Sequence, residues 1–66
     1  MNGEIKRVLL EKGFCFIRGE DGIEYFAHSS AFLAVTVFEA LRQGQRVTFE
    51  PARSPKGPRA EQVRLA

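Results

Sequence analysis

Two short stretches on either side of a glycine-rich turn do most to limit the fold of this chain. Residues 14–18 (FCFIR) and residues 23–28 (IEYFAH) read as two strands in which successive side chains point to opposite faces. On one face of each strand, Cys15, Ile17, Tyr25 and Ala27 suit a core. Residues 19–22 lie between them with the sequence GEDG, and an Asp-Gly pair is typical of a tight hairpin turn. The pattern therefore predicts a β-hairpin.

The two faces of this hairpin are predicted to differ. Phe14 and Phe16 fall on one face of the first strand, and Phe26 and His28 fall on one face of the second. Large aromatic rings are costly to expose unless they meet a ligand, and rings beside basic residues are typical of surfaces that stack unpaired bases. We therefore expect these side chains to form a base-stacking surface. The alternative is that the rings form the core.

Three further strands are expected from the same kind of pattern, over residues 4–10, 46–51 and 59–65. The alternation of the first strand breaks at residues 8–10, which indicates a β-bulge there. Residues 52–58 contain two prolines and a glycine and are expected to form a loop. Five short strands joined by such turns predict an all-β chain that closes, or nearly closes, into a barrel without exposed edges.

The connection between the third and fourth strands has mixed signals. Ser-Ser at residues 29–30 suits the cap of a short helical turn, and residues 38–43 suit a second turn that ends at Gly44. Residues 34–37, with the sequence AVTV, have strand propensity, and their β-branched side chains weaken a continuous helix through the connection. We therefore expect an irregular connection with short helical turns.

Composition limits the function classes. The 66 residues suffice for one small domain, and the 44% apolar content argues against disorder. No apolar run approaches about 18 residues, the start lacks the pattern of a signal peptide, and the single cysteine, Cys15, cannot form an internal disulfide. We therefore expect a cytoplasmic protein with no membrane segment. The net charge of +2 permits a polyanionic partner without requiring one.

Residues with catalytic or metal-binding potential are few. Cys15 and His28 alone cannot build a metal site. No paired acids or activated nucleophile are visible in the sequence. We therefore expect no catalytic residue, no metal and no cofactor, and we expect that the protein is not an enzyme.

Five segments, in order along the chain, resemble the motifs of the cold-shock domain family. Residues 12–17 (KGFCFI) resemble the first ribonucleoprotein motif, KGFGFI, and residues 25–28 (YFAH) resemble the second, VFVHF. Residues 3–6, 44–49 and 56–63 resemble the family patterns GxVK, GQKVxF and KGPxAxNV. Each motif alone is weak, but together they cover nearly the whole chain with the spacing of that family.

The resemblance implies both a fold and a function. The fold would be a single cold-shock-like domain over residues 1–66, a five-stranded antiparallel OB-fold barrel of Greek-key topology. The function would be binding of single-stranded RNA or DNA with low sequence specificity, of an RNA-chaperone or regulatory type. Bases would stack on aromatic side chains, and basic residues would meet phosphates. The residues expected to contact nucleic acid are Lys6, Arg7, Lys12, Phe14, Phe16, Phe26, His28, Phe38, Lys56 and Arg59.

The chain also departs from the family pattern. The family's Trp-Phe pair falls on Arg7 and Val8, and the aromatic residue after the histidine falls on Ser29. The glycine between the two phenylalanines falls on Cys15, which must fit inward. Each lost ring would cost ~1–3 kcal/mol of binding, so weaker binding is expected unless the planar guanidinium of Arg7 replaces the lost Trp.

The same connection supports a different function. Its AVTV segment stands where the family tends to be polar and glycine-rich. If Ala34, Val35 and Val37 are exposed, they form an apolar patch suited to a second copy or a protein partner. Phe38 has two readings as well, because it suits an outer stacking surface and also an apolar anchor for this connection.

Overall fold

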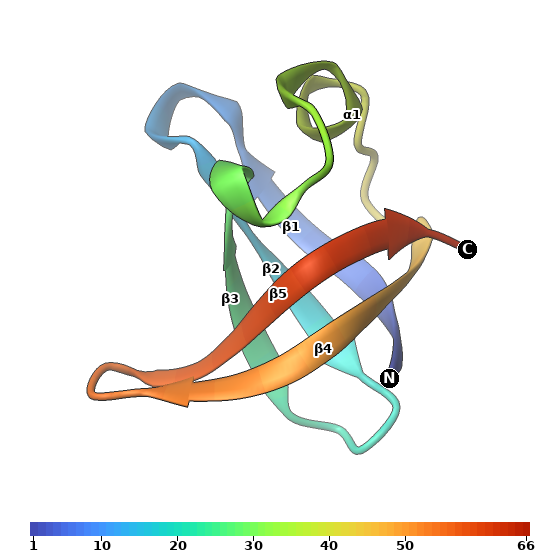
Figure 1. The fold of residues 1–66 in the computed structure, drawn as a ribbon. Coiled ribbons are helices and arrows are strands. Elements are labelled where there is room, and N and C mark those ends of the chain that lie inside the picture. The colour runs from blue at the N-terminus through green and yellow to red at the C-terminus, as the bar shows by residue number, and fades with distance from the viewer.

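The predicted strands form, and they close into a five-stranded barrel (Figure 1). The structure is a computed structural model that describes residues 1–66. Around the barrel the strands follow the order β1-β2-β3-β5-β4. Their bounds are β1 (Asn2–Leu9), β2 (Phe14–Gly19), β3 (Glu24–His28), β4 (Arg46–Ser54) and β5 (Gly57–Leu65). The all-β barrel is therefore confirmed. One seam differs from the purely antiparallel sheet that was expected, because β5 runs parallel to β3.

The bulge in β1 lies earlier than predicted. The pairing register of β1 with β2 shifts between Ile5 and Arg7, so Lys6 is the extra residue. This shift lets Ile5 and Val8 both face inward although three positions separate them, which strict alternation forbids. The prediction of a bulge at residues 8–10 was wrong. The extra residue at position 6 shifts the inward and outward positions of every later residue of β1, so the alternation looks broken only further along the strand. Arg7 consequently projects outward.

The predicted loop over residues 52–58 is mostly strand. β4 continues to Ser54 and β5 begins at Gly57, so only a tight turn remains, and the Ser54 hydroxyl donates a hydrogen bond to the Gly57 carbonyl at 2.9 Å. The prolines are tolerated because the outer end of this hairpin projects beyond the barrel (Figure 1), where strand edges need fewer backbone donors. The turn composition was recognised, but its length was overestimated.

The connection between β3 and β4 is irregular with short helices, as predicted. It contains the 3₁₀ turn η2 (Ser29–Ala31) and the helix α1 (Val35–Glu39), whereas the helical turn expected over residues 38–43 does not form there. Phe38 and Leu41 are buried in the core. Their burial at the end of the barrel outweighs the weak helix propensity of the β-branched residues that precede them.

The core is a single apolar cluster inside the barrel. Tyr25 packs on Phe49 with ring centroids 5.0 Å apart, and Phe32 packs on Phe38 at 5.4 Å. The buried residues are Ile5, Cys15, Ile17, Tyr25, Ala27, Phe32, Phe38, Leu41, Val47, Phe49, Ala60 and Val63. The rings on the predicted stacking face are not among them. No helix in the structure has the length and apolar character needed to cross a bilayer.

Candidate nucleic-acid interface

Three phenylalanines form a cluster on the outer face of β2 and β3. Phe16 lies opposite Phe26 in the strand pairing, and Phe14 lies opposite His28. The ring centroid of Phe14 is 5.6 Å from that of Phe16 and 5.0 Å from that of Phe26. All three rings are half-buried, so each keeps part of its surface open to solvent. We call these three residues and His28 the aromatic face.

His28 is held in a defined orientation at the end of β3. The Ser30 backbone N–H donates a hydrogen bond to His28 Nδ1 at 3.1 Å, and this contact also caps η2. Since Nδ1 accepts that bond, the proton of the neutral ring lies on Nε2. The exposed ring therefore offers solvent both a flat surface and a hydrogen-bond donor.

An arginine lies at each end of the phenylalanine pair. Strand pairing places Arg7 of β1 opposite Phe16 of β2. Phe16 in turn lies opposite Phe26 of β3, which lies opposite Arg59 of β5. Residues paired in this way project from the same face of a sheet. The four side chains form one row across four strands, Arg-Phe-Phe-Arg, which we call the aromatic row.

The neighbouring row on the same face is charged. Glu4 of β1 lies opposite Arg18 of β2, which lies opposite Glu24 of β3. Arg46 of β4 completes this row by pairing with Glu4. All four residues are exposed. We call these four residues the charged row. The sequence analysis did not identify it, although the two-residue spacing of Phe16 and Arg18 places both on one face of β2.

A groove of about 600 Å³, which we call the hairpin groove, lies between the aromatic face and the tip of the β4–β5 hairpin. Phe16, Phe26 and His28 line one side, and the hairpin segment 54–59 lines the other. Its charged side chains are those of Lys56 and Arg59, and no carboxylate lines it. The Nε atom of Arg59 is buried and has no hydrogen-bond partner. The groove thus combines aromatic walls with positive charge.

The two lysines near the start of the chain are placed differently. Lys6 occupies the bulge of β1 and is half-buried, next to the outward-facing Arg7. Lys12 is exposed at the end of the 3₁₀ turn η1 (Leu10–Lys12), two residues before Phe14. Gly13 follows in the left-handed region with φ 75°, a conformation that favours glycine and turns the chain into β2.

Phe38 does not belong to this interface. Only 3% of its surface is exposed, and it packs edge to face on Phe32 within the core. The expectation that it stacks on a base was therefore wrong, and its other reading, an apolar anchor, is the one observed. The physical reason is that α1 packs against the end of the barrel with the face that carries Phe38.

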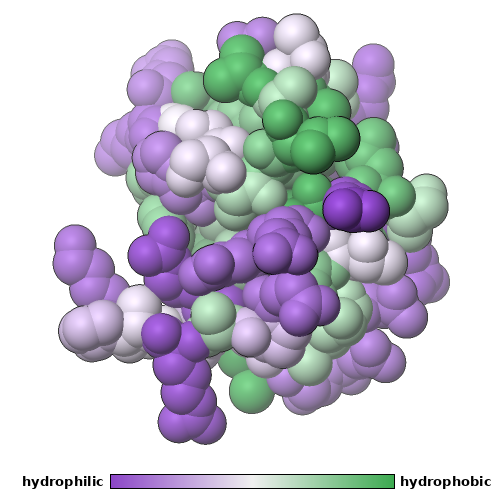
Figure 2. Space-filling view, in the orientation of Figure 1, coloured by the Kyte–Doolittle hydropathy of each residue, from purple (hydrophilic) through white to green (hydrophobic).

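The apolar segment before Phe38 is only partly exposed. Val37 packs against the core, whereas 61% of the Val35 surface and 85% of the Leu33 surface are exposed. Figure 2 shows apolar side chains gathered at this α1 end of the molecule. Ala34 and Val35 of the predicted patch are therefore exposed and Val37 is half-buried, and the exposed surface extends by one residue to Leu33, which sequence reasoning missed.

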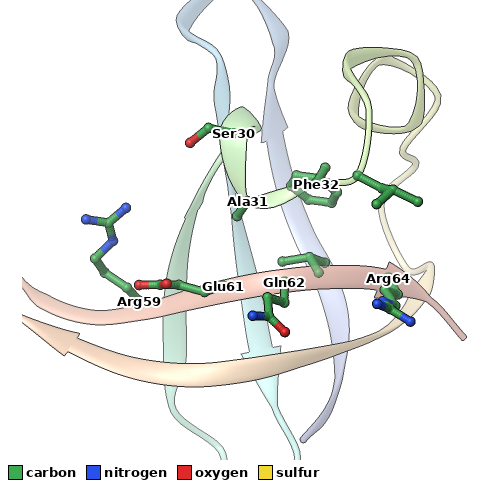
Figure 3. A pocket seen from close by; sticks show the side chains of 9 residues that line it. Ser30, Ala31, Phe32, Arg59, Glu61, Gln62 and Arg64 are labelled. Carbon is green, nitrogen blue, oxygen red and sulfur yellow. The ribbon is translucent and has the colours of Figure 1, made fainter.

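A second groove, of about 380 Å³, lies between η2 and β5 (Figure 3). Arg59 and Arg64 from β5 line it together with Glu61 (Figure 3). Gln62 of the same strand has a φ of 49°, and the register of β4 with β5 shifts beside it. Arg59 lines both grooves and so links the aromatic face to this one.

Cys15 lies on the inner side of β2, behind the aromatic face. It pairs with Val8 on one side and Ala27 on the other and has no exposed surface. Burial raises the pKa of the Cys15 thiol to about 12. The side chain therefore acts as a small core residue, as predicted for a residue in the place of the family's glycine. No group of three or more His, Cys, Asp or Glu side chains that could hold a metal ion is present.

Comparison with known proteins agrees with this arrangement. The family model of the "Cold-shock" DNA-binding domain matches residues 1–66. The chain is 44% identical over 62 residues to "Cold shock protein 1" of Lactiplantibacillus plantarum, covering 94% of this chain and 92% of that protein. It is 40% identical over 63 residues to "Cold shock-like protein CspC" of Bacillus cereus, covering 96% and 95%. With the "Major cold shock protein" of Streptococcus pyogenes serotype M6 it shares 39% identity over 61 residues, covering 92% and 90%. The chain belongs to the cold-shock domain family.

Proposed function

We propose that this protein binds single-stranded RNA or DNA with low sequence specificity, by stacking unpaired bases on the aromatic face. The aromatic row carries this proposal, since two adjacent rings with an arginine at each end provide stacking surfaces for bases within a region of positive charge that attracts a nucleic-acid strand. Binding of this kind holds strands unpaired, so the cellular role would be that of an RNA chaperone or regulator. We assign it no enzymatic activity.

The remaining basic side chains lie around the aromatic face, where we expect them to contact phosphates of the bound strand. Lys6 and Lys12 lie near the β1 side of the aromatic face, and Lys56 lies in the hairpin groove with Arg59. Each phosphate that such a residue neutralises contributes a slope of about −0.7 to the dependence of log K on log salt for single strands. We also propose that residues 1–66 form a single domain. We propose a location in the cytoplasm, where the thiol of Cys15 would stay reduced.

The interface is expected to bind more weakly than one with a full set of rings. Arg7, Val8 and Ser29 occupy positions where the family pattern has aromatic residues. Val8 packs against the core, and the Ser29 N–H donates a hydrogen bond to the Gly13 carbonyl at 2.9 Å. Neither side chain provides a ring for stacking. Arg7 projects from the aromatic face and can stack through its guanidinium plane, so it is the side chain placed to compensate.

The test is a titration of labelled oligo-dT and oligo-U with the wild-type protein at two salt concentrations. We expect saturable binding to both and a fall of log K with log salt. The slope should be about −2 to −3.5, equivalent to three to five phosphate contacts. A protein that is folded but shows no salt-dependent binding at micromolar concentration would contradict the proposal.

A protein partner or a second copy at the α1 end is the alternative. It depends on the exposed surfaces of Leu33 and Val35, which are large for side chains of a small domain. Sedimentation of the wild type and of Val35→Asp at high concentration tests it. Association that the substitution removes would support the alternative. A monomer for both, with nucleic-acid binding intact, would leave the aromatic face as the functional surface.

A further inference from the structure

We propose that the groove between Phe26 and the β4–β5 hairpin selects guanine, and that Arg59 is the residue that determines this selectivity. The inference rests on the proposed function, because it assumes that unpaired bases stack on the aromatic face. It goes further by assigning one position of the bound strand a base identity, which stacking alone does not provide since every base has a flat surface.

The position of Arg59 suits the edge of a stacked base. Its Cα is the partner of Phe26 in the β3–β5 seam, so both side chains project from the same face on neighbouring strands. Both also line the hairpin groove. A base lying on the Phe26 ring would therefore direct one edge toward β5, within reach of a long arginine side chain.

Arg59 also lacks a partner within the protein. Its Nε–H is buried without an acceptor, and a buried donor left unpaired is costly. No carboxylate lines the groove to supply that acceptor. Figure 3 shows Arg59 at one end of the second groove and Arg64 toward the other, both on β5. Because the Nε atom is itself covered, a ligand in the hairpin groove would meet the terminal N–H groups of the half-buried Arg59 side chain.

The donors around the groove favour a base edge with two acceptors. The guanidinium of Arg59 presents donors in a planar fork, and His28 presents Nε2–H from the same groove. Guanine offers two adjacent acceptors, O6 and N7, and is the base that arginine recognises most often. Adenine places an amino donor beside N7 and would oppose the fork. Cytosine also has two adjacent acceptors, but its single ring covers less of the Phe26 surface.

The experiment uses the wild-type protein and a short oligo-dT in which one central thymidine is replaced by dG, dA, dC or 7-deaza-dG. We expect the dG strand to bind about 5- to 150-fold more tightly than the dA strand, the range of one good bidentate base contact. The 7-deaza-dG strand, which lacks the N7 acceptor, should lose most of that gain. A preference for dC over dG would overturn the proposal.

Substitutions separate base recognition from simple charge. Arg59→Ala should bring dG and dA strands to similar affinity, and Arg59→Gln should move the preference toward dA, because an amide pairs with the N6 and N7 edge of adenine. Arg7→Ala, at the other end of the aromatic row, is the matched control and should lower all affinities by a similar factor. If Arg59→Ala instead lowers all strands equally and reduces the salt slope, Arg59 contacts phosphate and the proposal is wrong.

The two proposals fail in different ways. If no strand binds at any salt concentration, the proposed function itself is wrong. If all strands bind with equal affinity and a clear salt dependence, the proposed function stands and the assignment of a guanine site to Arg59 is overturned.

Discussion

Two neighbouring rows on one face of this barrel differ in a way that sets the limits of its interface. The aromatic row, Arg7-Phe16-Phe26-Arg59, has two rings, two positive charges and no acid. The charged row beside it, Arg46-Glu4-Arg18-Glu24, alternates in sign and sums to zero. The two rows share β1, β2 and β3 and face the same solvent, whereas β5 completes the aromatic row and β4 completes the charged row.

The difference shows that strand geometry alone does not define a binding surface. A phosphate chain on the aromatic row meets only positive charge, whereas on the charged row it meets a carboxylate next to each arginine. The bulge at Lys6 is responsible for this arrangement, because it shifts the phase of β1 so that Arg7 lies opposite Phe16. Without it, strict alternation would direct Lys6 outward and Arg7 inward.

Removal of a ring should have the largest effect. Phe16 lies next to both Arg7 and Phe26 in the aromatic row, so Phe16→Ala should remove a stacking surface and weaken oligo-dT binding by ~1–3 kcal/mol, about 5- to 150-fold. Fluorescence anisotropy with labelled oligo-dT measures this. Circular dichroism checks that the variant is folded, and an unchanged affinity in a folded variant would mean that bases do not stack on this row.

Removal of an arginine should have a smaller effect that depends on the row. Arg7→Ala should weaken binding about 2- to 5-fold, the range of an exposed cation–π contact or a single phosphate contact. Arg18→Ala is the matched control, since Arg18 lies on the same face in the charged row. It should change affinity less than Arg7→Ala. Equal losses for the two variants would show that net charge, and not position, controls binding.

Reversal of a charge in the charged row should extend the interface. Glu24→Lys removes the carboxylate beside Arg18 and adds a positive charge next to the aromatic row. We expect a gain in affinity of about 2-fold with a steeper salt dependence, as one more phosphate comes within reach of a cation. Glu39→Lys makes the same charge change on α1 and should give a smaller gain. A larger gain for Glu39→Lys would shift attention to the α1 end.

A change on the inner side of the sheet should affect stability and leave binding unchanged. The Tyr25 hydroxyl donates a hydrogen bond to Asp21 Oδ2 at 2.6 Å, and this bond lowers the pKa of Asp21. Ionised Asp21 therefore stabilises the fold above its ordinary pKa of 3.8, and that contribution is lost as the pH falls through the lowered value. Tyr25→Phe should flatten the acid side of a plot of Tm against pH.

The same variant tests the separation of the two faces. Because Tyr25 points into the barrel, Tyr25→Phe should bind oligo-dT like the wild type at neutral pH. Reduced affinity in a folded Tyr25→Phe variant would show that the inner and outer faces are coupled. An unchanged acid limb would show that the Asp21 hydrogen bond does not contribute to stability.

The features of the molecule that could be predicted from its sequence depend on short-range spacing. The aromatic face follows from residues two positions apart on single strands, and the barrel follows from the number of strands and turns. The position of the β1 bulge could not be predicted, because it depends on both Ile5 and Val8 reaching a core built by distant strands. The burial of Phe38 depends in the same way on Phe32, which lies across a loop.

The pairing of Phe26 with Arg59 could not be predicted from the sequence either. It joins strands separated by a long connection, and the parallel β3–β5 seam that creates it has no local pattern. Arg59 was expected at the interface because it follows the predicted proline-rich loop, within the segment 56–63 that resembles the family pattern. Only the pairing of β3 with β5 in the structure shows that Arg59 lies at the end of the aromatic row.

The most direct test of the central claim is an amide chemical-shift map of the ¹⁵N-labelled protein during titration with oligo-dT. We predict that the largest shifts occur along the aromatic row, at Arg7, Phe16, Phe26 and Arg59, with smaller ones at Arg18 and Glu24. Saturable shifts confined to the α1 end around Leu33 and Val35, or to the charged row, would contradict the claim that unpaired bases bind on the aromatic face.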